Sequence, residues 1–182
     1  MKNFLLLIIF VSGIFACTPA KKPIVDKNKL LVEIQQIEKK IYSDTVMSLD
    51  IGAANNAILL YSRFATQNPD DTASAEYLFR AAEICKSLSK GRLSLTYYER
   101  IENDYPDFPK VAVCIFMQGF VYENLLLDVE KAKFHYERFV EKYPNHALAK
   151  DTKVMIENIG KSPEDLIKSF QEKEKNKTSP NT

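Results

Sequence analysis

Apolar residues recur along the middle of the chain with the spacing of an α-helix. Ala132, Tyr136, Phe139 and Tyr143 follow one another at steps of four, three and four residues, which places them on one helical face. Most positions between them are charged or polar and suit water. Pro144 ends the predicted helix, because proline lacks an amide donor and disfavours helical geometry in the residue before it. The pattern predicts an amphipathic helix that needs a neighbouring helix to cover its apolar stripe.

This stretch has two earlier counterparts. Each counterpart carries a tyrosine, an arginine two residues later and a proline that ends the segment. The tyrosines are Tyr61, Tyr98 and Tyr136, and the prolines are Pro69, Pro106 and Pro144. Both series are spaced by 37 and then 38 residues. A fixed period in this range is typical of stacked helical repeats, in which each unit is covered by the next.

The apolar periodicity and the turn residues predict eight helices. Their ranges are 29–43, 51–67, 72–89, 92–105, 110–127, 129–143, a seventh that Asn145 caps and that ends before Gly160, and an eighth to about 174. Asp128 is predicted to cap the sixth helix, and Ser162, followed by Pro163, to cap the eighth. We expect the eighth helix to close the end of the array and residues 175–182 to form a disordered tail.

The repeated segment resembles the tetratricopeptide repeat, a helix–turn–helix unit of 34 residues with small residues where its two helices cross. The small residues in this chain are Ala57, Ser94 and Ala132 on second helices and Ala82 and Gly119 on first helices. The resemblance implies an all-α, right-handed tetratricopeptide-like solenoid of about three helix pairs plus C-terminal helices, over residues 29–174. The longer period and the absence of tryptophan resemble repeats of bacterial envelope proteins, including the BamD-type assembly lipoproteins and the Tol–Pal-associated periplasmic repeat protein.

The N-terminal segment resembles a bacterial lipoprotein signal. Lys2 is followed by thirteen mostly apolar residues, which is short for a membrane-spanning helix and suits a signal peptide over residues 1–16. The resemblance implies cleavage before Cys17 and lipidation of that cysteine, with residues 17–28 as the lipidated N-terminus and tether. An ordinary secretory signal with an incidental cysteine is the alternative. Because Thr18 is not aspartate, the resemblance implies a lipid-anchored protein of the cell outer membrane that faces the periplasm.

Charge and motifs exclude several classes of function. After residue 16 the chain carries 24 basic and 24 acidic side chains, which argues against binding to nucleic acid and against a polybasic grip on a membrane surface. The chain shows no catalytic, phosphate-binding or zinc-binding motif, so we expect no enzyme activity, no metal and no cofactor. Cys85 and Cys114 are expected to be buried free thiols, with a disulfide as the alternative.

The resemblance also implies a concave groove lined by the first helix of each pair. The residues carried over to that groove are Glu76, Phe79, Glu83, Lys86, Val113, Phe116, Phe120, Glu123, Asn124 and Asp151. The alternative is that the phenylalanines fill the core. The recurrent arginines Arg63, Arg100 and Arg138 indicate either an anion-binding ladder or charge pairing between repeats.

These features predict a non-catalytic adaptor that binds envelope proteins or peptides and reaches the membrane through lipid on Cys17. The second hypothesis is an accessory lipoprotein that binds a glycan or another small ligand beside a transporter.

Overall fold

The computed structural model describes residues 26–41 and 50–178, and every regular element in this part of the chain is an α-helix. The helices are α1 (Lys27–Ile41), α2 (Ile51–Gln67), α3 (Ala73–Ser87), α4 (Gly91–Asp104), α5 (Val111–Asn124), α6 (Val129–Lys142), α7 (Ala149–Asn158) and α8 (Pro163–Thr178). The first six begin and end within three residues of the predicted positions. Cys17, the rest of residues 1–25 and residues 179–182 lie outside the described part.

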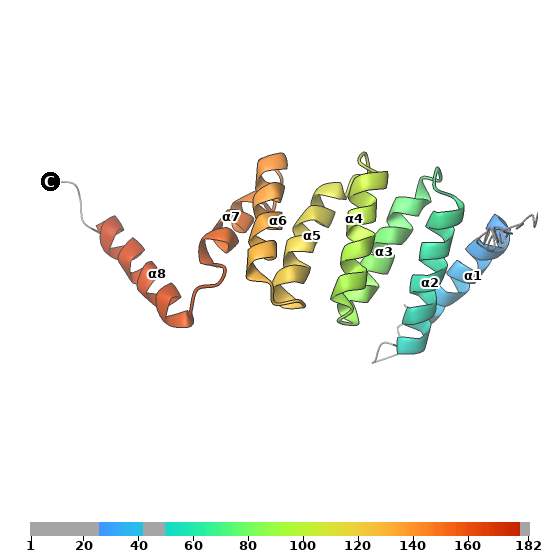
Figure 1. Ribbon diagram of the computed structural model, residues 1–182, viewed down its shortest axis with the longest axis horizontal. Coiled ribbons are helices and arrows are strands. Elements are labelled where there is room, and N and C mark those ends of the chain that lie inside the picture. The colour runs from blue at the N-terminus through green and yellow to red at the C-terminus, as the bar shows by residue number, and fades with distance from the viewer. Residues whose placement is uncertain (1–25, 42–49, 179–182) are drawn as a thin grey trace, which may run out of the picture.

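The helices form three pairs in a row, α1–α2, α3–α4 and α5–α6, followed by α7 (Figure 1). Each second helix also packs against the first helix of the next pair, so that α2 contacts α3, α4 contacts α5 and α6 contacts α7. Every inner helix is thus covered on two sides by its neighbours in sequence. This arrangement is a helical solenoid, and the predicted all-α, tetratricopeptide-like fold is confirmed.

The repeated tyrosines form equivalent parts of the core. Tyr61, Tyr98 and Tyr136 are all fully buried on the second helices of the three pairs. The apolar residue three positions further along each helix is fully buried as well. These residues are Phe64, Ile101 and Phe139. The 37- and 38-residue period therefore corresponds to one layer of core per pair.

The predicted small residues lie where the helices cross. A Cβ atom at Gly119 would lie 2.6 Å from Cδ1 of Tyr136, so the backbone of α5 touches the face of that ring. In the preceding pair, the buried hydroxyl of Ser94 donates a 2.9 Å hydrogen bond to the carbonyl oxygen of Ala82. Small residues at these positions allow the short interaxial distances that close packing requires.

The predicted caps differ in outcome. The Asp128 carboxylate accepts a 3.0 Å hydrogen bond from the Lys131 amide, and the Ser162 hydroxyl accepts one of 3.1 Å from the Asp165 amide. Both predicted caps are confirmed. The prediction for Asn145 is wrong, because α7 begins at Ala149 and its amide bonds to the carbonyl oxygen of His146.

The end of the array also differs from the prediction. Helix α8 points away from the row (Figure 1) and makes no extensive contact with α1–α7 among the described residues. None of its described side chains is buried. Helix α8 continues to Thr178, four residues beyond its predicted end at about 174.

Candidate binding groove

The first helices of successive pairs present one continuous face, which we name the first-helix face. Salt bridges and lysine contacts cross from one first helix to the next. Arg80 on α3 reaches back to Glu38 on α1 at 2.6 Å, and Lys86 on α3 reaches forward to the sulfur of Met117 on α5 at 3.5 Å. The first-helix face is therefore built from α1, α3 and α5, with α7 at its end.

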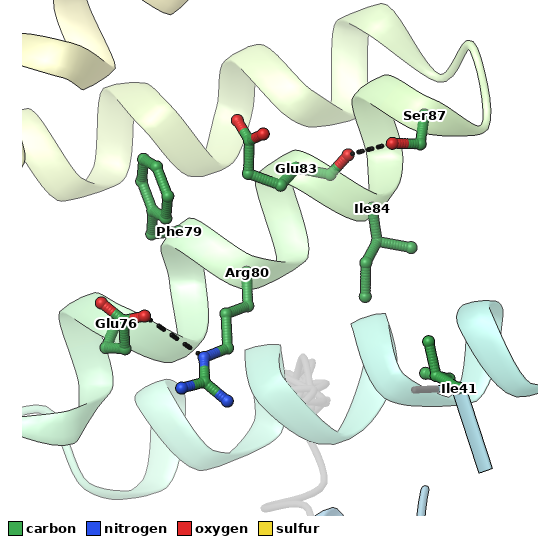
Figure 2. A pocket seen from close by; sticks show the side chains of 7 residues that line it. All are labelled: Ile41, Glu76, Phe79, Arg80, Glu83, Ile84 and Ser87. Carbon is green, nitrogen blue, oxygen red and sulfur yellow. Dashed lines mark hydrogen bonds and ion pairs between the residues drawn. The ribbon is translucent and has the colours of Figure 1, made fainter. Parts of the chain in front are cut away.

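A cavity of about 310 Å³ opens between α1 and α3 (Figure 2). Its lining residues are Ile41, Glu76, Phe79, Arg80, Glu83, Ile84 and Ser87. Ile41 comes from the end of α1 and all the others from α3, where they recur at helical spacing. Three of the predicted groove residues, Glu76, Phe79 and Glu83, are thus brought together around one hollow.

Buried tyrosines position carboxylates along the first-helix face. In each pair, the tyrosine hydroxyl of the second helix donates a hydrogen bond to a glutamate of the first helix. The pairs are Tyr61 with Glu38 at 2.9 Å, Tyr98 with Glu83, and Tyr136 with Glu123 at 2.7 Å. Burial, and then the hydrogen bond to glutamate, raises the pKa of Tyr98 and Tyr136 above the usual value, so both phenols remain donors. The core thereby fixes the place of three surface carboxylates.

Lysines cover the phenylalanine rings of this face. The Lys110 ammonium lies 4.7 Å from the centre of the Phe79 ring and 2.8 Å from the Glu76 carboxylate. The Lys86 ammonium lies 5.7 Å from the centre of the Phe120 ring. Burial opposes ionisation of Glu76, but hydrogen bonds from Lys110 and Arg80 outweigh it and lower the pKa of that carboxyl. Ion pairs and half-buried aromatic rings therefore alternate along the first-helix face.

The remaining predicted residues take different places. Phe116 is half-buried and packs against the buried rings of Tyr136 and Phe139, at 5.4 and 5.6 Å between centres. Asn124 is exposed, and its side-chain amide bonds to the Phe120 carbonyl of its own helix at 3.0 Å. Val113 is half-buried on α5, and Asp151 is exposed on α7. Phe79 and Phe120 are half-buried and keep part of their surface on the first-helix face.

Sequence reasoning missed Glu38, Arg80, Lys110 and Met117. Arg80 was detectable in part, because it follows Glu76 by four residues, the spacing of a helical ion pair. The contacts of Glu38 and Lys110 join residues more than thirty positions apart, and no local pattern signals them.

The recurrent arginines connect successive second helices. Arg138 pairs with Glu102 of the preceding pair, and Arg100 donates a 3.1 Å hydrogen bond to the Ala65 carbonyl oxygen of the pair before it. Arg63 is exposed. Charge pairing between repeats is therefore found for Arg138, whereas Arg100 bonds to the preceding repeat through a carbonyl oxygen and forms its ion pair with Asp104 of its own helix.

The cysteines are free and buried, as predicted, within residues 26–41 and 50–178. Burial raises the pKa of Cys85 to about 11 and that of Cys114 to about 12, which leaves both thiols protonated and unreactive at neutral pH. In the same part of the chain, no group of three or more histidine, cysteine, aspartate or glutamate side chains is arranged to hold a metal ion. No helix there is both long and apolar enough to cross a bilayer.

Comparison with known proteins bears on the third pair. Residues 114–146 match the tetratricopeptide-repeat family model. The matched range covers most of α5 and all of α6, and it includes Phe120, Glu123 and Tyr136. No curated protein matches the sequence. The chain thus carries a tetratricopeptide repeat within a solenoid of similar pairs, and repeats of this family generally mediate protein–protein interactions on non-catalytic scaffolds.

Proposed function

We propose that this protein is a non-catalytic, lipid-anchored adaptor that binds envelope proteins or peptides through the first-helix face. The observation that carries the proposal is the hollow between α1 and α3. There Glu76, Phe79 and Glu83 stand together on a rigid helix, beside paired cations. Half-buried rings and fixed charges on one face suit an extended or helical peptide.

The location is part of the proposal. Lipid on Cys17 would hold the solenoid at the outer membrane, facing the periplasm, with residues 17–28 as the tether. Two or more acyl chains suffice for stable anchoring, because each buried methylene contributes about 0.8 kcal/mol. A role in outer-membrane assembly or envelope organisation follows from the resemblance to BamD-type lipoproteins.

The binding face is tested by capture from detergent-solubilised membranes, followed by mass spectrometry. An Asn124→Arg variant adds bulk and charge at an exposed position of the first-helix face, where the Asn124 side chain bonds to the Phe120 carbonyl oxygen of its own helix. The matched control is Glu99→Arg on α4, an exposed position of a second helix. We expect Asn124→Arg to lose most of the captured envelope protein and Glu99→Arg to retain it. Equal capture by both variants would rule out the first-helix face as the binding surface.

The anchor is tested separately by metabolic labelling with an alkyne fatty acid. The unaltered chain should take up label and sediment with outer membranes, and Cys17→Ser should do neither. Unlabelled wild-type protein would contradict the lipid anchor and leave the binding face untouched. The glycan hypothesis receives less support, because Lys110 and Lys86 lie over the Phe79 and Phe120 rings on which a sugar would stack.

A further inference from the structure

The three carboxylates held by buried tyrosines differ in one respect, which is the cation beside them. Glu38 receives Arg80 at 2.6 Å, and Glu83 receives Lys86 at 2.8 Å. Glu123 accepts a hydrogen bond from the Tyr136 hydroxyl at 2.7 Å, and among the side chains that the structure describes no cation lies within ion-pairing distance of it. Within the described side chains, a tyrosine-held glutamate thus occurs in each of the three pairs, and two of these glutamates have a cation beside them.

The missing cation has a position in the repeat. Residues 80, 117 and 155 are spaced by 37 and 38 residues, the same period as the tyrosines. The first of these is Arg80, which pairs with Glu38. The second is Met117, whose sulfur accepts a hydrogen bond from the Lys86 ammonium at 3.5 Å. The third is Met155 on α7, a neutral side chain, so no cation comes to Glu123 from this register.

A hollow lies where that cation would be. A cavity of about 380 Å³ is lined by Glu123 on one side and by Val154, Met155 and Ile159 on the other. Asn158, Gly160 and Lys161 complete its rim. The Lys161 side chain is exposed, and its ammonium donates to the Asn158 side-chain oxygen at 3.4 Å. An alkyl chain that ends in a cation matches these walls, because its stem would meet the apolar side chains and its charge the fixed carboxylate.

We propose that the cavity between α5 and α7 binds a lysine or arginine side chain of the partner protein, with its charge on Glu123. This inference rests on the proposed function and specifies the chemistry of the partner at that end of the first-helix face. Two examples within the protein support it, since Arg80 and Lys86 already pair with the corresponding carboxylates, with the Arg80 guanidinium over the Tyr77 ring and the Lys86 ammonium beside the Met117 sulfur. Tyr136 holds the carboxylate in place before the partner arrives, which lowers the ordering cost of binding.

The test uses the full chain in detergent micelles and three labelled, blocked pentapeptides that differ only at the central residue, which is lysine, norleucine or glutamate. Fluorescence anisotropy measures binding, and the methyl signal of Met155 reports whether the peptide reaches the cavity, with Met117 as an internal reference. We expect the lysine peptide to bind at least fivefold more tightly than the norleucine peptide and to shift Met155 alone. Glu123→Gln should remove this preference. Equal affinities, or a preference that survives in Glu123→Gln, would overturn the inference.

A second variant distinguishes loss of the binding site from unfolding of the protein. Met155→Arg places a guanidinium at the register of Arg80, so it should fill the site from within, abolish lysine-peptide binding and leave the melting temperature no lower. Unchanged peptide binding by Met155→Arg would show that the cavity is not the site. Light scattering tests whether a second copy of this protein occupies the cavity instead. A wild-type dimer that dissociates in the Glu123→Gln variant would show that it does, and would overturn the inference. If the envelope capture succeeds while these tests fail, the adaptor function stands without this site.

Discussion

Gly119 sets how closely α5 and α6 approach, so its replacement by alanine tests the packing directly. A Cβ atom at this position would lie 2.6 Å from Cδ1 and 2.7 Å from Cε1 of Tyr136, distances that real Cβ contacts do not show. The Tyr136 ring is fully buried, and its hydroxyl is held by Glu123. Because the ring is fixed at both ends, the added methyl group must push the two helices apart.

The expected cost follows from two opposing effects. Overpacking a core by one methyl group costs about 1–3 kcal/mol, and a clash with a fixed ring belongs near the top of that range. Alanine recovers about 1 kcal/mol, because glycine is the poorer residue inside a helix. We therefore expect Gly119→Ala to lower the free energy of unfolding by about 2 kcal/mol, a fall of roughly 4–8 °C in melting temperature for a domain of this size.

Thermal and urea unfolding, followed by circular dichroism, measures this loss. The matched control is Gly52→Ala on α2, where the nearest described atom to the new Cβ would be the side-chain oxygen of Asp50, at 3.2 Å. That variant should be neutral or slightly more stable. Adding Tyr136→Leu to Gly119→Ala should cost less than the sum of the two single changes, because the clash is then absent. Equal effects of the two glycine substitutions would refute the close-approach argument.

Three further results are expected. Because the pKa values of Tyr98 and Tyr136 are raised, the folded state keeps phenol protons that the unfolded state releases near pH 10. The free energy of unfolding should therefore fall as pH rises beyond 10. Urea unfolding at a series of pH values, followed by tyrosinate absorbance, measures this fall. Leu127→Gly should stabilise the protein by about 0.5–1 kcal/mol in urea unfolding, because Leu127 is 79% exposed and has a left-handed φ of 54°. Arg138→Ala removes the nearer of two cations from the largely buried Glu102 carboxylate, leaving Lys142 at 4.0 Å, and should cost about 1–2 kcal/mol. Arg63→Ala, at the exposed equivalent position, should cost about 0–0.5 kcal/mol.

The helices and their stacking were predictable because buried positions obey a strict period. Tyr136 and Pro144 mark a core layer and a helix end, and both follow from local geometry. Caps were predictable where one side chain reaches the amide three residues ahead, as Asp128 does. Asn145 misled because the turn before α7 takes its hydrogen bonds from His146, whose carbonyl oxygen and ring nitrogen accept amides further along the chain.

The site was predictable only in part, since its contacts depend on helix rotation. The glutamates that accept the tyrosine hydroxyls precede their tyrosines by 23, 15 and 13 residues, so they share no spacing that a repeat search would detect. Phe79, Phe116 and Phe120 are all half-buried, and both Phe79 and Phe116 contact buried tyrosine rings of the second helices. The sequence left open whether these rings fill the core or line a groove, and one ring can do part of each.

The buried positions of the repeat are nearly the same in the three pairs, whereas the exposed positions differ from pair to pair. Positions occupied by Tyr61, Tyr98 and Tyr136 cannot change without loss of a layer, because each ring is fully buried. The register of Arg80, by contrast, carries arginine and then two methionines, and each change alters which charge is satisfied within the chain. A repeat protein of this kind gains selectivity where one unit departs from its neighbours on an exposed helix face. For this chain that departure falls at Glu123, where the core supplies the hydroxyl and the surface leaves the cation to a partner.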